Sequence, residues 1–173
     1  MKTRNIVLTG LFIALGLVLP FFTGQIPSIG NKLLPMHLPV FLGGFILGGP
    51  IGLVVGLITP ILRSILFGMP PFYPVAIAMS FELATYGGVA GFLFRKNSES
   101  TLNIYASLLM AMIAGRIVWG VAMLVLLSVN GAAFTLKMFI GSALINSVPG
   151  LIAQIVIIPV LLISLKSANL LKQ

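Results

Sequence analysis

The chain has 173 residues, of which 59% are hydrophobic and only 7% are charged, and its mean hydropathy is +1.19. Because a soluble domain carries roughly 25% charged residues, this composition predicts one integral membrane domain over residues 1–173. The absence of cysteine excludes disulfides, thiolate catalysis and cysteine-based metal sites. The net charge is +8, but the chain has no soluble module that could carry a basic patch for nucleic acid. We therefore interpret the basic residues as a signal of membrane topology.

Six apolar segments follow one another along the chain, and a span needs roughly 20 such residues. The first, Ile6 to Phe22, follows Lys2 and Arg4 but has no small-residue cleavage site, which predicts a transmembrane helix rather than a cleaved signal. The later segments are HLPVFLGGFILGG from His37, Ile51 to Phe67, Val75 to Phe94, Leu102 to Val129, and Met138 to Leu165, the last being interrupted at Pro149-Gly150 and Pro159.

The second of these segments is short. Its thirteen residues reach roughly 20 Å, whereas the hydrocarbon core is roughly 30 Å thick. The second and third segments are therefore either tilted or joined as a re-entrant hairpin at Gly48-Gly49-Pro50. Both alternatives give the later segments the same orientation.

Basic residues are distributed unequally between the two sides of such a bundle. With six segments, the side that carries both termini holds Lys2, Arg4, Arg95, Lys96, Lys166 and Lys172, whereas the other side holds only Lys32 and Lys137. Cytoplasmic loops carry the excess of lysine and arginine. We therefore expect an all-α bundle of six transmembrane helices with both termini in the cytoplasm.

Several polar residues lie at membrane depth, where ionisable groups are costly and mark functional sites. At 1.5 Å per residue, Arg63 lies about 7 Å, Glu82 about 10 Å, Asn146 about 12 Å and Arg116 about 20 Å below the outer surface. His37 stands at the outer mouth of the second segment. This shared depth favours a polar binding pocket open to the outside. The alternative is a structural network in which Glu82 pairs with Arg63 or Arg116 only to hold helices together.

Aromatic residues accompany the ionic ones. Tyr86 is one helical turn from Glu82 and Trp119 is almost one turn from Arg116, so each pair shares a helix face. The charges of Arg63, Arg116 and Glu82 sum to +1, which favours a ligand with one anionic group. A neutral ligand fits instead if one arginine faces backbone carbonyls or water.

The inventory of reactive groups is too small for most chemistry. With one histidine, two acids and no cysteine, neither a transition-metal site nor a catalytic triad can be assembled, and no phosphate-binding GxxxxGK[ST] loop is present. We therefore predict no catalytic residues, no metal and no cofactor.

Gly10 and Ala14 form a small-xxx-small pair on the first segment, and Gly52 and Gly56 repeat the spacing on the third. Such pairs let another helix approach closely. They serve either packing within the bundle or the docking of a partner membrane subunit.

Residues 36 to 94 carry a resemblance to a known family. His37-Leu38-Pro39-Val40, the turn at Gly48 to Gly52, Gly68-Met69-Pro70-Pro71, and Phe81-Glu82-Leu83 followed by Tyr86-Gly87 resemble the substrate-binding S components of energy-coupling factor (ECF) vitamin transporters. Gly10-x-x-x-Ala14 is similar to the family's small-residue motif on the first helix, with Gly in the first place where Ala is usual.

The resemblance implies a multi-pass protein of a prokaryotic plasma membrane that binds a vitamin-like molecule from outside. It implies docking, through Gly10 and Ala14, on an ECF transmembrane T subunit with two ATPase subunits, and a first loop, TGQIPSIGNKLLPM, that closes over the pocket. Members for pyridoxine or hydroxymethylpyrimidine look nearest, with pantothenate members next. The substrate-binding residues expected on this basis are His37, Arg63, Glu82, Tyr86, Arg116, Trp119 and Asn146.

Two other functions are consistent with the same residues. The chain could be a stand-alone transporter or channel with Glu82 as its proton-coupling group, or a structural membrane subunit in which Glu82 is paired internally and no ligand binds.

Overall fold

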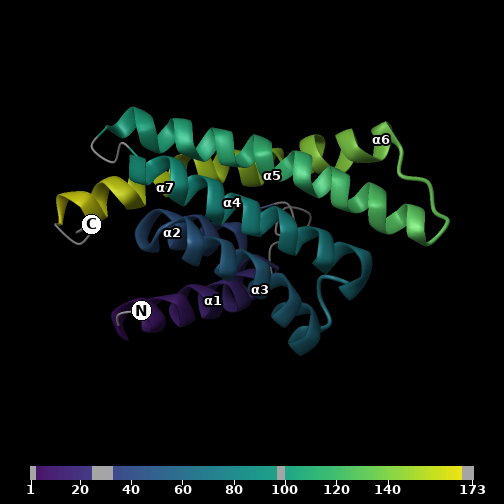
Figure 1. The fold of residues 1–173 in the computed structure, drawn as a ribbon, viewed down its shortest axis with the longest axis horizontal. Coiled ribbons are helices and arrows are strands. Elements are labelled where there is room, and N and C mark those ends of the chain that lie inside the picture. The colour runs from purple at the N-terminus through teal and green to yellow at the C-terminus, as the bar shows by residue number, and fades with distance from the viewer. Residues whose placement is uncertain (1–2, 25–32, 97–99, 169–173) are drawn as a thin grey trace.

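The structure, a computed structural model, describes residues 3–24, 33–96 and 100–168 (Figure 1). Within these residues the chain is helical and forms no strand. Short π-helical turns at Phe72–Ala76 and Ile140–Ile145 precede α4 and α7 respectively. The helices are α1 (Thr3–Gly24), α2 (His37–Leu47), α3 (Gly49–Phe67), α4 (Ile77–Lys96), α5 (Thr101–Val129), α6 (Leu136–Phe139) and α7 (Val148–Ser167).

Five helical stretches of the described chain are long and apolar enough to cross a membrane. They are Thr3–Thr23, Gly49–Phe67, Phe72–Phe94, Thr101–Val129 and Val148–Ser167. The multi-pass, all-helical prediction is therefore confirmed. The second predicted segment is α2, whose 11 residues extend only about 16 Å. This helix is too short to cross the membrane, so the prediction of six full spans is not confirmed.

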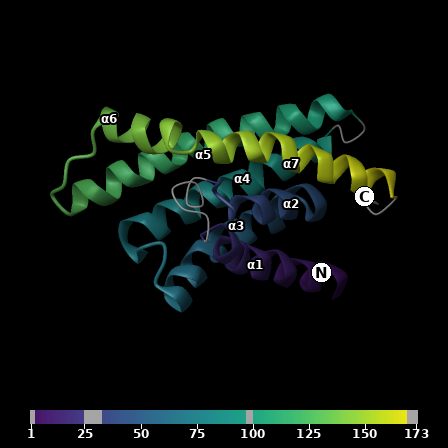
Figure 2. The same ribbon diagram turned by 180° about the vertical axis from the view of Figure 1, so that it is seen from behind.

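The first turn of α1 and the last turn of α7 lie at the same end of the molecule (Figures 1 and 2). This arrangement agrees with a bundle whose two ends face one side of the membrane. Which side that is remains a prediction from the distribution of lysine and arginine. Most of the loop expected to close over the pocket falls at residues 25–32, outside the described residues.

Glycines bring α2, α3 and α4 into backbone contact. A Cβ built on Gly87 of α4 would collide with the carbonyl of Gly52 on α3, and one built on Gly44 of α2 would collide with the carbonyl of Gly87. Gly48, whose φ of 95° suits glycine best, joins α2 directly to α3. These three helices therefore form a tightly packed helical hairpin with α4 laid across it.

The final predicted segment, 138–165, is divided in the structure. α6 and the π-helical turn end at Ile145, and α7 begins at Val148 with a proline in its first turn. Proline fits the first turn of a helix because its missing N–H is not needed there. The break lies at Asn146-Ser147, just before the expected position, and Pro149-Gly150 belong to the first turn of α7. The interruption expected at Pro159 is wrong, because α7 continues through that residue.

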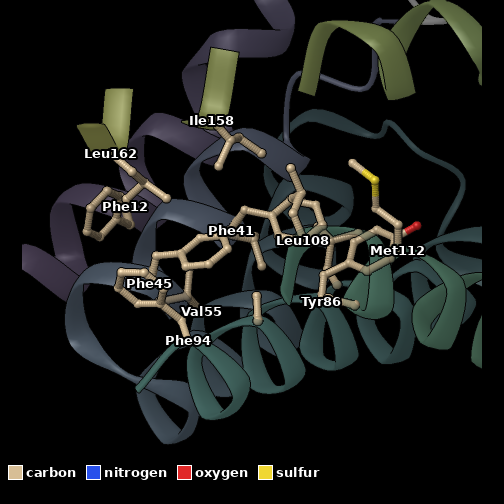
Figure 3. Packing of buried hydrophobic residues seen from close by; sticks show 14 of the residues in the cluster. Phe12, Phe41, Phe45, Val55, Tyr86, Phe94, Leu108, Met112, Ile158 and Leu162 are labelled. Atoms are coloured by element: carbon tan, nitrogen blue, oxygen red, sulfur yellow. The ribbon is translucent and has the colours of Figure 1, made fainter. Parts of the chain in front are cut away.

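Two apolar clusters fill the interior. The larger one extends from Phe12, Phe45 and Phe94 to Tyr86 and Met112 and draws on α1, α2, α3, α4, α5 and α7 (Figure 3). The smaller one consists of Ala78, Trp119 and Met123 with partly buried neighbours from α5 onward. Because Ala78 is one turn before Glu82 and Trp119 is almost one turn after Arg116, Glu82 and Arg116 occupy the level between the two clusters.

Candidate functional site

An ion pair joins α4 to α5 inside the bundle. Nη1 of Arg116 lies 2.8 Å from Oε1 of Glu82, and the two side chains are 12% and 2% exposed. The hydroxyl of Tyr86 donates a hydrogen bond of 2.8 Å to the same carboxylate oxygen. Desolvating two charges is expensive and is offset only by close geometry and further hydrogen bonds, so these three groups form one interdependent unit.

The spacing between α4 and α5 is set by Gly115. A Cβ on Gly115 would collide with the ring of Tyr86, so glycine lets that ring lie directly on the backbone of α5. Arg116 is the next residue along α5 and is thereby brought within reach of Glu82. The sequence motif Gly115-Arg116 thus positions the cation as well as supplying it.

Arg116 is not fully satisfied by this pairing. A guanidinium carries five N–H donors in a planar fork, and in this case Nε and Nη2 are buried without a hydrogen-bond partner. A free guanidinium edge of this kind is suited to two parallel hydrogen bonds to one planar acceptor. Arg116 therefore retains binding capacity after it has neutralised Glu82.

His37 lies beside this unit from the start of α2. The residue is 1% exposed, its ring centroid lies 5.5 Å from that of Tyr86, and neither ring nitrogen makes a well-formed hydrogen bond, although the Leu34 backbone lies nearby. Phe41, one turn further along α2, stacks on the Tyr86 ring with the two centroids 4.8 Å apart. The structure therefore places His37 beside Tyr86, which is another of the seven residues predicted from the sequence.

Gln154 is a further buried polar residue, which the sequence analysis did not identify. It is fully buried on α7, and both atoms of its amide lack hydrogen-bond partners. α7 packs against α2 and α5, the helices that carry His37 and Arg116. The signal was present in the sequence as the single amide in the apolar run LIAQIVIIPV, but of the amide side chains only Asn146 was predicted to belong to the site.

Arg63 is used elsewhere in the fold. Its Nη1 donates to the carbonyl oxygen of Leu17 on α1, and its guanidinium lies 4.7 Å from the Phe21 ring and 5.6 Å from the Phe67 ring. It makes no ion pair with Glu82, whose pair is with Arg116. Arg63 therefore joins α3 to α1. It is the arginine that faces a backbone carbonyl, the arrangement under which the sequence analysis expected a neutral ligand.

Trp119 belongs to the smaller apolar cluster with Ala78 and Met123, and Asn146 lies in the break before α7. The Trp119 ring contacts those of Phe134 and Phe139, with centroids 6.0 and 6.2 Å away. Asn146 is exposed in the break before α7. The structure thus brings together four of the seven predicted residues and leaves Arg63, Trp119 and Asn146 in other surroundings.

The donor set does not suit a metal ion. Among the residues that the structure describes, no group of three His, Cys, Asp or Glu side chains comes together. The cluster offers hydrogen-bond donors and acceptors and aromatic faces instead. Such a mixture is suited to holding a small polar organic molecule.

The family model for the ECF transporter, substrate-specific component, matches residues 4–163. The chain belongs to this family. No individual curated protein matches it. The S component is therefore a multi-pass membrane protein and the substrate-binding subunit of an ECF importer, and the family generally leaves ATP hydrolysis to partner subunits.

Gly10 and Ala14 lie on the exposed side of α1 of this S component. A Cβ built on Gly10 meets no atom within 4 Å, so this glycine is not required for packing within the described bundle. Of the two uses considered for the small-residue pair, internal packing is therefore unsupported at Gly10. The surface is free to contact another helix.

Proposed function

We propose that this S component binds a small, water-soluble vitamin or vitamin precursor from outside a prokaryotic plasma membrane. Pyridoxine or hydroxymethylpyrimidine is the preferred class and pantothenate the next. The S component docks through Gly10 and Ala14 on a T subunit, and two ATPase subunits drive delivery. This proposal rests on membership of the family together with the polar cluster described above.

The observation that carries the proposal is the set of buried polar atoms without partners. They belong to His37 on α2, Ser107 and Arg116 on α5, and Gln154 on α7; Ser107 lies more than two turns from Arg116 along α5, so the proposed site takes the other three. A buried donor or acceptor left unpaired costs free energy comparable to a lost hydrogen bond, and a fold retains several of them for a reason. A bound ligand that pairs them would recover this free energy. These three residues, with Glu82 and Tyr86, are the proposed binding site.

Charge supports an uncharged ligand. Glu82 and Arg116 neutralise each other, and Arg63 is engaged by the Leu17 carbonyl and two aromatic rings. An added anion would compete with Glu82 for Arg116 in a desolvated site, where unbalanced charge is costly. A hydroxylated aromatic heterocycle brings no such cost and offers a π-face to Tyr86 and His37.

Pantothenate remains the second candidate because of one feature of Arg116. Its free edge, Nε and Nη2, has the geometry that carboxylates bind in bidentate fashion. A carboxylate ligand would then share Arg116 with Glu82. The two substrate classes therefore differ in whether binding adds a charge to the site.

The test is to identify what the purified protein binds. Mass spectrometry of a heat extract should reveal a retained heterocycle, and calorimetry with pyridoxine, hydroxymethylpyrimidine and pantothenate should rank the three. We expect tight binding without ATP that is weakened at least tenfold by Arg116→Gln. Failure of a broad vitamin panel to bind would refute the proposal.

A stand-alone transporter is distinguished by reconstitution. Proteoliposomes that contain only this chain would accumulate substrate under a proton gradient if Glu82 coupled transport by itself. Under the proposal they show no uptake until T and ATPase subunits are added. Absence of any ligand together with normal stability would favour a purely structural subunit.

A further inference from the structure

A groove opens near the end of the molecule where α1 begins and α7 ends. It is a groove of about 310 Å³ whose walls are α1 and α7 and whose floor is α2, which lies between those two helices in both views (Figures 1 and 2). Its lining residues include Arg4, Leu8, Leu42, Ile46, Leu161 and Leu165. It shares none of the residues of the proposed substrate site.

The groove follows from the shortness of α2. α1 has 22 residues and extends about 33 Å, roughly twice the length of α2. The flanking helices therefore continue past the helix between them. Leu42 and Ile46 remain partly exposed at the bottom of the groove, and Leu161 on its wall is 40% exposed.

The lining is apolar except at one place. Arg4, in the first turn of α1, is exposed and borders the groove, while exposed Lys166 directly follows the lining residue Leu165. In a membrane-spanning bundle this end lies at the level of the lipid headgroups. Basic pockets between transmembrane helices at that level bind anionic headgroups.

We propose that this groove binds an anionic phospholipid, with one acyl chain along Leu8, Leu42 and Leu161 and the phosphate on Arg4. An apolar groove that opens to the bilayer gains dispersion contacts when a chain fills it. Arginine pairs well with a phosphate because its fork can donate two parallel hydrogen bonds. The combination of an apolar channel and a cation at its headgroup end matches a phospholipid better than a soluble anion.

The position of the groove around α1 separates it from the proposed docking surface. Residues 4, 8 and 12 face the groove, whereas Gly10 and Ala14 lie about 140° away around the helix at 3.6 residues per turn. A partner helix on the small-residue pair therefore leaves the groove open. Lipid binding and subunit docking can be tested independently.

The experiment titrates the full chain in detergent with dioleoylphosphatidylglycerol or dioleoylphosphatidylcholine, which share their acyl chains and differ in headgroup charge. Native mass spectrometry counts bound lipids, and thermal unfolding reports stabilisation. We expect the anionic lipid to bind at least tenfold more tightly. Arg4→Gln should remove this preference, whereas Lys137→Gln, at exposed Lys137 on α6, should retain it.

A second variant tests the acyl-chain half of the site. Leu161→Trp fills the groove from its exposed wall and should weaken binding of both lipids severalfold without lowering the unfolding temperature in detergent alone. Equal affinity for the two lipids, or unchanged binding in Arg4→Gln or Leu161→Trp, would overturn the proposal. If Leu161→Trp kept its lipid but lost assembly with the T subunit, the groove would belong to a protein partner instead.

Discussion

The ring of Tyr86 lies directly on the backbone of Gly115, with no room for a Cβ between α4 and α5. We expect Gly115→Ala to push the helices apart and to lengthen the Glu82–Arg116 contact. Overpacking of this kind costs about 1–3 kcal/mol, and ligand affinity should fall with it. Thermal unfolding and calorimetry measure the two effects. Gly10→Ala is the control, since a Cβ there meets nothing, and equal stability loss in both variants would contradict this account.

The buried ion pair should behave as a unit. Glu82→Gln leaves the charge of Arg116 inside the bundle without its partner, which typically costs about 3–5 kcal/mol. We expect Arg116→Gln to be similarly harmful and the double variant Glu82→Gln/Arg116→Gln to be much less unstable than the sum of the two. Equilibrium unfolding in detergent gives the four free energies of the cycle. Strict additivity would show that the two groups do not interact.

The hydrogen bond from Tyr86 to Glu82 can be removed without changing shape. Tyr86→Phe should lower stability by about 1–3 kcal/mol, because it takes one hydrogen bond from a buried carboxylate. Tyr105→Phe is the matched control, as Tyr105 is 37% exposed and should lose little. The same unfolding measurement serves both, and equal losses would refute the importance of the Tyr86 contact.

Gln154 should show opposite effects on stability and binding. Gln154→Leu removes two buried amide atoms that have no partner in the fold, so the ligand-free protein should unfold at an equal or higher temperature. Ligand affinity should fall at least tenfold because the amide is proposed to contact the ligand. Ile155→Leu on the same helix should leave affinity unchanged. A Gln154→Leu variant that is unstable and binds normally would assign the amide a structural role.

Docking on the T subunit should depend on the small residues of α1. Gly10→Leu and Ala14→Leu should prevent close helix approach and reduce co-purification with T and ATPase subunits by at least tenfold, with ligand binding intact. Ala106→Leu places the same bulk at another exposed position, on α5. Normal assembly of the α1 variants would move the docking surface elsewhere.

The sequence predicted the long helices well because membrane spans are set by length and hydropathy, which are local properties. It placed Tyr86 on the same helix face as Glu82 by helical spacing, and it predicted that Glu82 pairs with Arg63 or Arg116 if the polar residues form a structural network. It could not choose the partner of Glu82. Arg63 lies at a similar depth, and only the packing of α3 against α1 shows that its guanidinium turns to the Leu17 carbonyl.

Asn146 and Gln154 show how far the position of a polar residue along an apolar segment predicts whether it is buried. Counting residues along the sixth segment placed Asn146 about 12 Å inside, and in the structure Asn146 is exposed directly after the π-helical turn. Gln154 is the amide whose side-chain atoms are both buried and unpaired. Tertiary packing decides which of the two amides faces the interior, and local sequence patterns do not show it.

The glycine contacts among α2, α3 and α4 separate the scaffold from ligand recognition. Where Gly44, Gly52 and Gly87 meet, the distance between helices is fixed by main-chain atoms and does not depend on the size of any side chain. Residues around Tyr86 and Glu82 can therefore be exchanged without altering the framework that holds them. A pocket redesigned for another small molecule should keep these three glycines, vary His37 and Gln154, and change Arg116 only together with its partner Glu82.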